Sequence, residues 1–302
     1  MHTSCSFDVL PAPELSPEAL YKKGLALGLD FITFTDHDSM KAYESLGAER
    51  EKLVSGVELT VRDPVRAGHT VHVNVYELDL AEFAELRELA DVEHNLLSVI
   101  DFLKKHRLPY IYNHPLWFEF HEEADPAKVP ELAKLFPVLE YNLHELKLKN
   151  EMIVALAERL GKGIAATTDA HTGKLGQIYT LAKGESFREF FGNIEKGKNF
   201  IVPEDLTREF LIEEMNTWID LIFEKSRQSR EKKAFLCGIR PIDAVVRISR
   251  SNLLHCSPGL NRKTMELFYL LANSGIPASV YLHSEKSTAR QIVKQIRHGW
   301  RK

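Results

Sequence analysis

Segments typical of strands and of helices alternate along the first 200 residues, and this alternation limits the possible folds more than any other feature. The expected strands are residues 31–35, 56–61, 70–76, 109–112, 138–141 and 163–167. The expected helices are residues 16–28, 80–106 (as one helix or two), 126–136 and 148–161. Such alternation predicts an α/β fold built on a parallel sheet or barrel.

The strand signals fade after about residue 203. Residues 204–233, 240–252, 262–274 and 287–300 are expected to be helical. Charge changes along the chain as well: residues 172–302 hold 22 Lys and Arg against 14 Asp and Glu, a net charge of +8, whereas the preceding residues carry −12. We therefore expect an α/β domain over 1–202 and a helical, basic C-terminal extension over 203–302.

Composition excludes several classes of protein. The chain is 44% hydrophobic and 27% charged, which suits a full core and not a disordered chain. No apolar run approaches the ~18 residues that span a bilayer, and the first 20 residues lack a basic and apolar signal sequence, so we expect a cytoplasmic protein without membrane partners. Three cysteines without a CxxC pair argue against a disulfide framework and against a thiolate zinc site.

Acidic residues and histidines follow several of the expected strands. Asp36-His37, His114 and the Asp169-Ala170-His171 segment each come directly after one. Because the carboxyl ends of parallel strands meet at one face, these side chains are expected to converge. A single histidine after a strand is more often a hydrogen-bonded surface residue. The combination of carboxylates and imidazoles in an N-terminal region that holds ten of the 13 histidines nevertheless favours a metal site.

Several sequence blocks resemble a known family. In order and spacing, HTSCSFD (2–8), SPEAL (16–20), GLDFITFTDHD (28–38), GVEL (56–59), VHVNVYEL (71–78), YNHP (112–115) and TTDAHT (167–172) resemble the polymerase and histidinol phosphatase (PHP) family of metal-dependent phosphoesterases. The resemblance covers about residues 1–200. It implies a distorted (β/α)7 barrel with two or three metal ions at the carboxyl ends of the strands.

The resemblance also implies a role for individual residues. Glu58 is expected to bridge two metal ions. The further metal ligands would be His2 and Asp169 on the first ion, His72 and His114 on the second, and Asp8, His37 and His171 on the third. Asp36, His37 and His171 are the candidate catalytic residues, Asp36 by orienting a ligand histidine or by receiving a proton. Histidine and carboxylate ligands suit Zn, Mn and Fe alike, so the expected cofactor is two or three divalent ions of one of these metals.

The N-terminus departs from the family pattern. The family begins with a strand that ends in His-x-His, whereas here the sequence starts at Met1-His2, so the first strand and the first histidine are missing from it. Either the sequence starts at an internal methionine of a longer product, or the protein has weakened or lost catalysis. Both interpretations stay open.

Two functions fit these observations. The favoured one is a metal-dependent phosphoesterase that hydrolyses a phosphomonoester or a small nucleotide, with a small phosphorylated substrate as its partner. The alternative is a non-catalytic or regulatory PHP module whose basic tail, residues 225–233 above all, binds a partner or nucleic acid. Lys174 follows His171 closely and could contact a substrate phosphate, although a solvated surface cation is the more common role.

Overall fold

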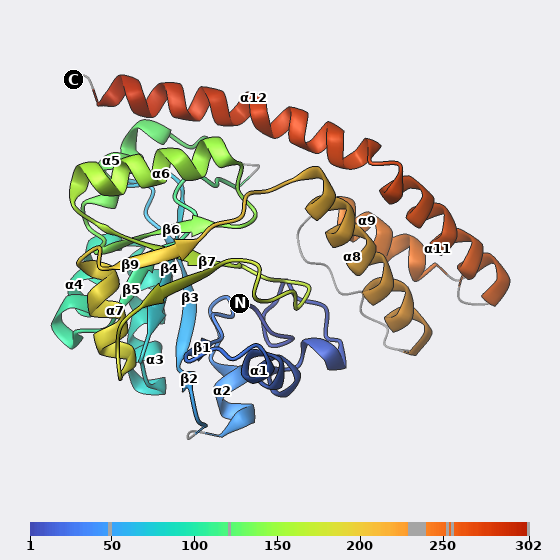
Figure 1. Cartoon of the computed structure of the whole chain (residues 1–302), viewed down its shortest axis with the longest axis horizontal. Coiled ribbons are helices and arrows are strands. Elements are labelled where there is room, and N and C mark those ends of the chain that lie inside the picture. The colour runs from blue at the N-terminus through green and yellow to red at the C-terminus, as the bar shows by residue number, and fades with distance from the viewer. Residues whose placement is uncertain (48–49, 120–121, 229–239, 252–253, 255–256, 301–302) are drawn as a thin grey trace.

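A mixed five-stranded sheet forms the centre of the molecule (Figure 1). The computed structural model describes residues 1–302 except 48–49, 120–121, 229–239, 252–253, 255–256 and 301–302. In spatial order the strands are β3 (Gly56–Arg62), β4 (Thr70–Tyr76), β5 (Tyr110–Tyr112), β6 (Val138–Asn142) and β7 (Gly163–Thr167). All five coincide with segments that the sequence predicts as strands, and the α/β class is confirmed.

One strand of this sheet runs against the other four. β4 pairs antiparallel with both β3 and β5, whereas β5, β6 and β7 are parallel. The expectation of a uniformly parallel sheet is therefore wrong at β4, because the short connection 63–69 can return the chain only in the opposite direction. The described strands form this open sheet and two small two-stranded sheets, so the closed seven-unit barrel is not seen among them.

The two small sheets flank the central one. β1 (Ile32–Thr33) pairs parallel with β2 (Leu53–Val54), and β8 (Tyr179–Ala182) pairs antiparallel with β9 (Asn199–Val202). The backbone of Met1 and His2 joins the chain after β1 to the chain after β7. The Thr35 amide donates to the Met1 carbonyl, and the His2 amide donates to the Ala170 carbonyl. His2 is thus held beside the chain that follows β7.

Helices cover the sheet at positions that the sequence largely predicts. They are α1 (Pro17–Ala26), α2 (Lys41–Leu46), α3 (Leu80–Glu88), α4 (Leu96–His106), α5 (Val129–Ala133), α6 (Lys147–Leu160) and α7 (Phe187–Glu195), with short helical turns at Pro13–Leu15, Leu89–Glu93 and Pro126–Lys128. Residues 80–106 form two helices because His94 takes a left-handed backbone and the Asn95 side chain then caps α4.

Strand alternation separates apolar from polar side chains within β3 and β4. Val57, Leu59 and Val61 of β3 join the main core cluster, with Val71, Val73 and Val75 of β4 and the apolar side of α4. Side chains at the intervening positions point to the opposite face, because the side-chain period of a strand is two. That opposite face of β3 and β4 holds Glu58 and His72.

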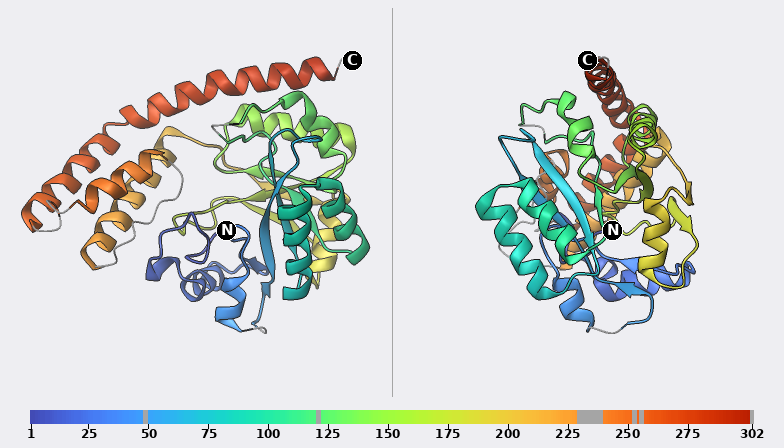
Figure 2. Two further views of the ribbon diagram at one scale, coloured as in Figure 1. Left: turned by 180° about the vertical axis from the view of Figure 1, so that it is seen from behind. Right: turned by 90° about the vertical axis from the view of Figure 1, so that its left-hand side faces the viewer.

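The C-terminal region is helical, as predicted, and packs into the rest of the chain. It comprises α8 (Arg208–Gln228), α9 (Arg240–Ser249), α11 (Pro258–Asn273) and α12 (Ile276–Gly299). Helix α12 runs back along the molecule past α5 and α6 (Figures 1 and 2), and Ile292, Val293 and Ile296 join the main core cluster. Most of the basic segment 225–233 lies outside the described residues.

Helix α8 also packs against the N-terminal segment. Val9, Leu10, Ala12 and Leu15 form one buried cluster with residues of α8, α9 and α11. The boundary at residue 202 therefore stays a prediction about domain organisation, since both parts contribute to shared cores. No helix in the described part of the chain is long and apolar enough to cross a membrane.

Candidate metal centre

Glu58 lies at the centre of a buried group of histidines. Its Oε1 lies 3.0 Å from His72 Nδ1 and 3.1 Å from His114 Nε2, and its Oε2 lies 3.3 Å from His2 Nε2. His72 reaches Glu58 because β4 is antiparallel, which puts its first residues beside the carboxyl end of β5, where His114 follows. The antiparallel direction of β4 thus explains how His72, near the start of its strand, meets His114, which follows the end of another strand.

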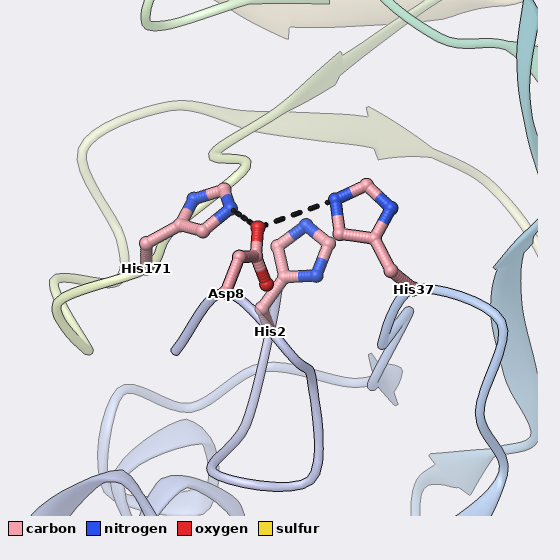
Figure 3. Close-up of side chains that lie close together, drawn as sticks. All are labelled: His2, Asp8, His37 and His171. Atoms are coloured by element: carbon pink, nitrogen blue, oxygen red, sulfur yellow. Dashed lines mark hydrogen bonds and ion pairs between the residues drawn. The ribbon is translucent and has the colours of Figure 1, made fainter. Parts of the chain in front are cut away.

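Asp8 forms a second centre with two histidines (Figure 3). Its Oδ2 lies 2.7 Å from His171 Nε2 and 3.3 Å from His37 Nε2. The His2 ring lies between the two histidines, with ring centroids 4.7 Å from His37 and 4.4 Å from His171. Three distant segments, the N-terminal loop, the chain after β1 and the chain after β7, therefore supply this centre.

His2 and Asp169 link the two centres. His2 Nε2 lies 2.9 Å from Asp169 Oδ1 as well as near Glu58. The potential ligand atoms fall into three groups in which all atoms lie within 4.8 Å of one another: His2, Glu58 and Asp169; His37, Glu58 and His72; and His2, Asp8, His37 and His171. These groups contain seven of the eight sequence-predicted ligands, and the eighth, His114, lies outside them but contacts Glu58. His2, His37 and Glu58 each belong to two groups.

The backbone at two of these residues is strained. His114 has a φ of 25° and Asp169 a φ of 46°, in the left-handed region that residues other than glycine seldom adopt. Such conformations persist only when the surrounding structure imposes them, and they cluster at functional sites. Each is the second residue after a strand that ends at the polar cluster, β5 for His114 and β7 for Asp169.

Glu140 was not predicted as a site residue, and it supports both strained segments. This buried carboxylate accepts hydrogen bonds from the His114 backbone amide and from the Thr167 hydroxyl. It also accepts one from the Asn142 amide, whose nitrogen lies 3.1 Å from Glu140 Oε2 and 3.3 Å from Asp169 Oδ2. The sequence signal was a glutamate within the apolar strand VLEYN, where a charge needs partners.

Asp36 holds the N-terminal loop. One of its carboxylate oxygens accepts from the Thr3 backbone amide at 2.5 Å and the other from the Thr3 hydroxyl at 2.8 Å. Asp36 thus orients the residue next to His2, so any influence on that histidine passes through Thr3. Burial raises the pKa of the Asp36 carboxyl.

The carboxylates of the cluster favour positive charge on the neighbouring histidines. Burial opposes the protonation of His2, but hydrogen bonds to Asp169 and Glu58 raise its pKa to about 9. Burial likewise opposes the protonation of His37 and His114, yet Glu58, with Asp8 at His37, raises their pKa values to about 9 and about 10. Despite burial, the same contacts keep the pKa values of Asp8, Glu58 and Asp169 well below the usual range.

These residues fit divalent metal ions. The donor set is carboxylate oxygen and imidazole nitrogen, which suits Zn, Mn and Fe. The buried carboxylates attract protons onto the neighbouring histidines, and a metal cation would supply the same positive charge while using the neutral imidazoles as ligands. Nδ1 of His2 and Nδ1 of His37 are buried without a hydrogen-bond partner in the described structure, a further mark of an unsatisfied polar site.

Helix α8 supports the segment that carries His171. The Thr172 hydroxyl donates to both carboxylate oxygens of Glu214, each at 3.0 Å, and both residues are buried. Lys174 Nζ lies 3.2 Å from Glu214 Oε1 and 3.6 Å from Glu213 Oε2. Lys174 is therefore engaged by helix α8, an arrangement that sequence reasoning did not anticipate.

Comparisons with known proteins gave similarities of fold only. Neither the family models nor the curated proteins compared with the sequence gave a match. Among solved structures, a chain named as a metal-dependent phosphoesterase from Bifidobacterium adolescentis has 16% identity and a TM-score of 0.41, over 56% of this chain and 85% of that one. The lesion-specific endonuclease PfuEndoQ from Pyrococcus furiosus has 17% identity and a TM-score of 0.46, over 67% and 56%. An amidohydrolase from Chromobacterium violaceum has 14% identity and a TM-score of 0.40, over 56% and 85%.

Proposed function

We propose that this protein is a metal-dependent phosphoesterase of the PHP type, which hydrolyses a phosphomonoester or a small nucleotide. The observation that carries the proposal is the contact of Glu58 with three histidines, beside a second cluster around Asp8. One carboxylate shared by several imidazoles is the arrangement that holds neighbouring metal ions. The ligand set comprises His2, Asp8, His37, Glu58, His72, His114, Asp169 and His171.

The protein's own residues would have three tasks in this reaction. Glu58 and Asp169 supply negative charge that fixes the positions of cations, and Glu140 and Thr172 hold the loops that carry His114 and His171. Divalent ions held by these residues would supply Lewis-acid polarisation of the phosphoryl group and activation of water. His37 and His171, both on Asp8, would act in the reaction as ligands that place a cation beside the reacting phosphate.

The proposal is tested by metal content and hydrolysis together. The purified protein, reconstituted with Mn, Zn or Fe, is expected to retain two or three ions per chain and to hydrolyse an aryl phosphate. The His171→Ala protein should lose one ion. The Glu58→Ala protein should lose more than one, because Glu58 belongs to two of the three groups of potential ligand atoms. His106→Ala is the matched control, since His106 pairs with Glu82 outside the cluster.

Two outcomes would contradict the proposal. Failure to retain metal after reconstitution would remove the metal site itself. Full metal occupancy without hydrolysis of any phosphate ester would instead favour a non-catalytic PHP module, with the metal ions in a structural role.

A further inference from the structure

Two large aromatic side chains are exposed at the edge of the metal-ligand cluster. Trp117 has 43% of its surface exposed and Phe7 has 64%. Side chains of this size gain about 1.5–3 kcal/mol from full burial, so exposure next to a polar cluster needs an explanation. Each ring also contacts a candidate ligand, which ties both to the site rather than to the general surface.

The rings form a continuous row. The centroid of Phe7 lies 5.3 Å from that of His37, the His37 centroid lies 5.1 Å from that of His72, and the His72 centroid lies 5.7 Å from that of Trp117. The Trp117 ring is stacked on His72 at an interplanar angle of 30° and approaches His114 edge-on at 5.3 Å. The two exposed rings are therefore the ends of a row whose middle members are metal-ligand candidates.

The backbone fixes both end rings in place. The Trp117 amide donates to the His114 carbonyl at 2.9 Å, which closes a turn directly after the ligand, and Leu116 is buried in the core beside it. Phe7 lies between Ser6 and Asp8, where the Ser6 hydroxyl donates to Asp8 at 2.6 Å and accepts from the His37 amide at 3.2 Å. Each aromatic side chain thus projects from a loop that is anchored to the cluster.

We infer that Trp117 is a stacking platform for a planar aromatic ring in the organic part of the substrate, with Phe7 at the opposite end of the row. This inference rests on the proposed phosphoesterase function and specifies its substrate class: a small phosphate ester that carries an aromatic ring system, as a nucleoside phosphate does. A phosphate held at the cluster places its organic group beside these rings. A base stacked on an aromatic side chain contributes about 1–3 kcal/mol.

Charge favours a small ester over a long nucleic acid. The first 171 residues carry a net charge of −12, which repels an extended polyanion. Lys174, a cation that follows the His171 loop, is paired with Glu213 and Glu214. The described surroundings of the cluster therefore offer aromatic stacking rather than a basic track for a phosphate backbone.

The test compares two substrates that differ only in the base. Adenosine 5′-monophosphate and ribose 5-phosphate are assayed with the metal-loaded wild-type protein and with Trp117→Leu, Trp117→Phe and Phe7→Leu. Trp117→Leu is expected to lower the ratio of kcat/KM for the two substrates at least about fivefold, the loss of one stacking contact, and Trp117→Phe to lower it less. Phe200→Leu, at an exposed aromatic residue of β9 outside the row, is the matched control and should leave the ratio unchanged.

Fluorescence gives a readout independent of turnover. Adenosine 5′-monophosphate, but not ribose 5-phosphate, is expected to quench the tryptophan emission of the full chain, and Trp117→Phe should abolish that difference. Quenching without hydrolysis of either ester would support the platform and contradict the phosphoesterase proposal. Suppose instead that both esters are hydrolysed, that Trp117→Leu leaves the ratio of their kcat/KM values unchanged, and that both quench the tryptophan emission equally. This result would overturn the stacking platform while the phosphoesterase proposal stands.

Discussion

Replacement of Thr172 by Val tests whether helix α8 positions the metal-ligand cluster. The Thr172 hydroxyl donates to both oxygens of the buried Glu214 carboxylate, at 3.0 Å each. A hydrogen bond to a charged group contributes about 1.5–3 kcal/mol, and its loss leaves a buried carboxylate less well satisfied. Because Lys174 still pairs with Glu214 at 3.2 Å, we expect the free energy of unfolding to fall by about 2 kcal/mol.

The same substitution should weaken metal binding at His171, the preceding residue. Loss of a residue that orients a ligand typically lowers metal affinity 10–100-fold, so we expect about a tenfold loss for one ion and little change for the ions around Glu58. Metal affinity is measured by titration calorimetry. Stability is measured by urea unfolding followed through Trp218, which is buried in α8.

A double-mutant cycle isolates the interaction. Thr172→Val and Glu214→Gln are combined, and the coupling free energy should exceed about 1 kcal/mol because the two side chains are in direct contact. Thr217→Val is the matched control, since this hydroxyl bonds only to the Glu213 carbonyl of its own helix and its loss should cost at most about 0.5 kcal/mol. A Thr172→Val protein as stable as the control, with unchanged metal affinity, would refute the supporting role of α8.

Three further predictions follow from the structure. Because the pKa values of His2, His37 and His114 are raised, protonation of these histidines stabilises the metal-free fold fully below about pH 6.5, and this stabilisation is lost as the pH rises through 9 to 10. Metal affinity should rise over the same pH range, with proton release measured by calorimetry. A metal affinity that stays constant from pH 7 to 9 would contradict this prediction. Glu140→Ala leaves three hydrogen-bond donors without their acceptor and should lower the free energy of unfolding by about 3 kcal/mol, seen as a lower melting temperature, whereas Glu140→Gln should cost less. Removal of residues 203–302 should prevent folding, because it removes core residues of α12 and the packing of α8 on the N-terminal segment. Folding of the fragment is measured by circular dichroism, and its metal content by metal analysis. A fragment that folds and binds metal would show instead that 1–202 is an independent domain.

The sequence alone determined the local elements and the residue types of the site. The strand at 163–167 and the helix at 16–28 are predicted from local residue patterns, and the structure has β7 and α1 there, with the Ser16 side chain capping α1 and Pro17 as its first residue. Candidate ligands such as His114 and Asp169 were found because polar residues that follow apolar strands are few and easily recognised. These features depend on residues close together in the chain.

Only the tertiary structure decided how these elements are arranged and supported. The short connection 63–69 makes β4 antiparallel to β3, but no local pattern states that β4 lies beside β5, and this placement brings His72 and His114 together at Glu58. The support of the His171 loop by Glu214 joins residues 42 positions apart, and Glu140 serves three strand ends at once. Periodicity and capping report interactions between neighbours in the chain, whereas strand order and buried polar contacts depend on how distant segments pack, which the sequence pattern does not encode locally.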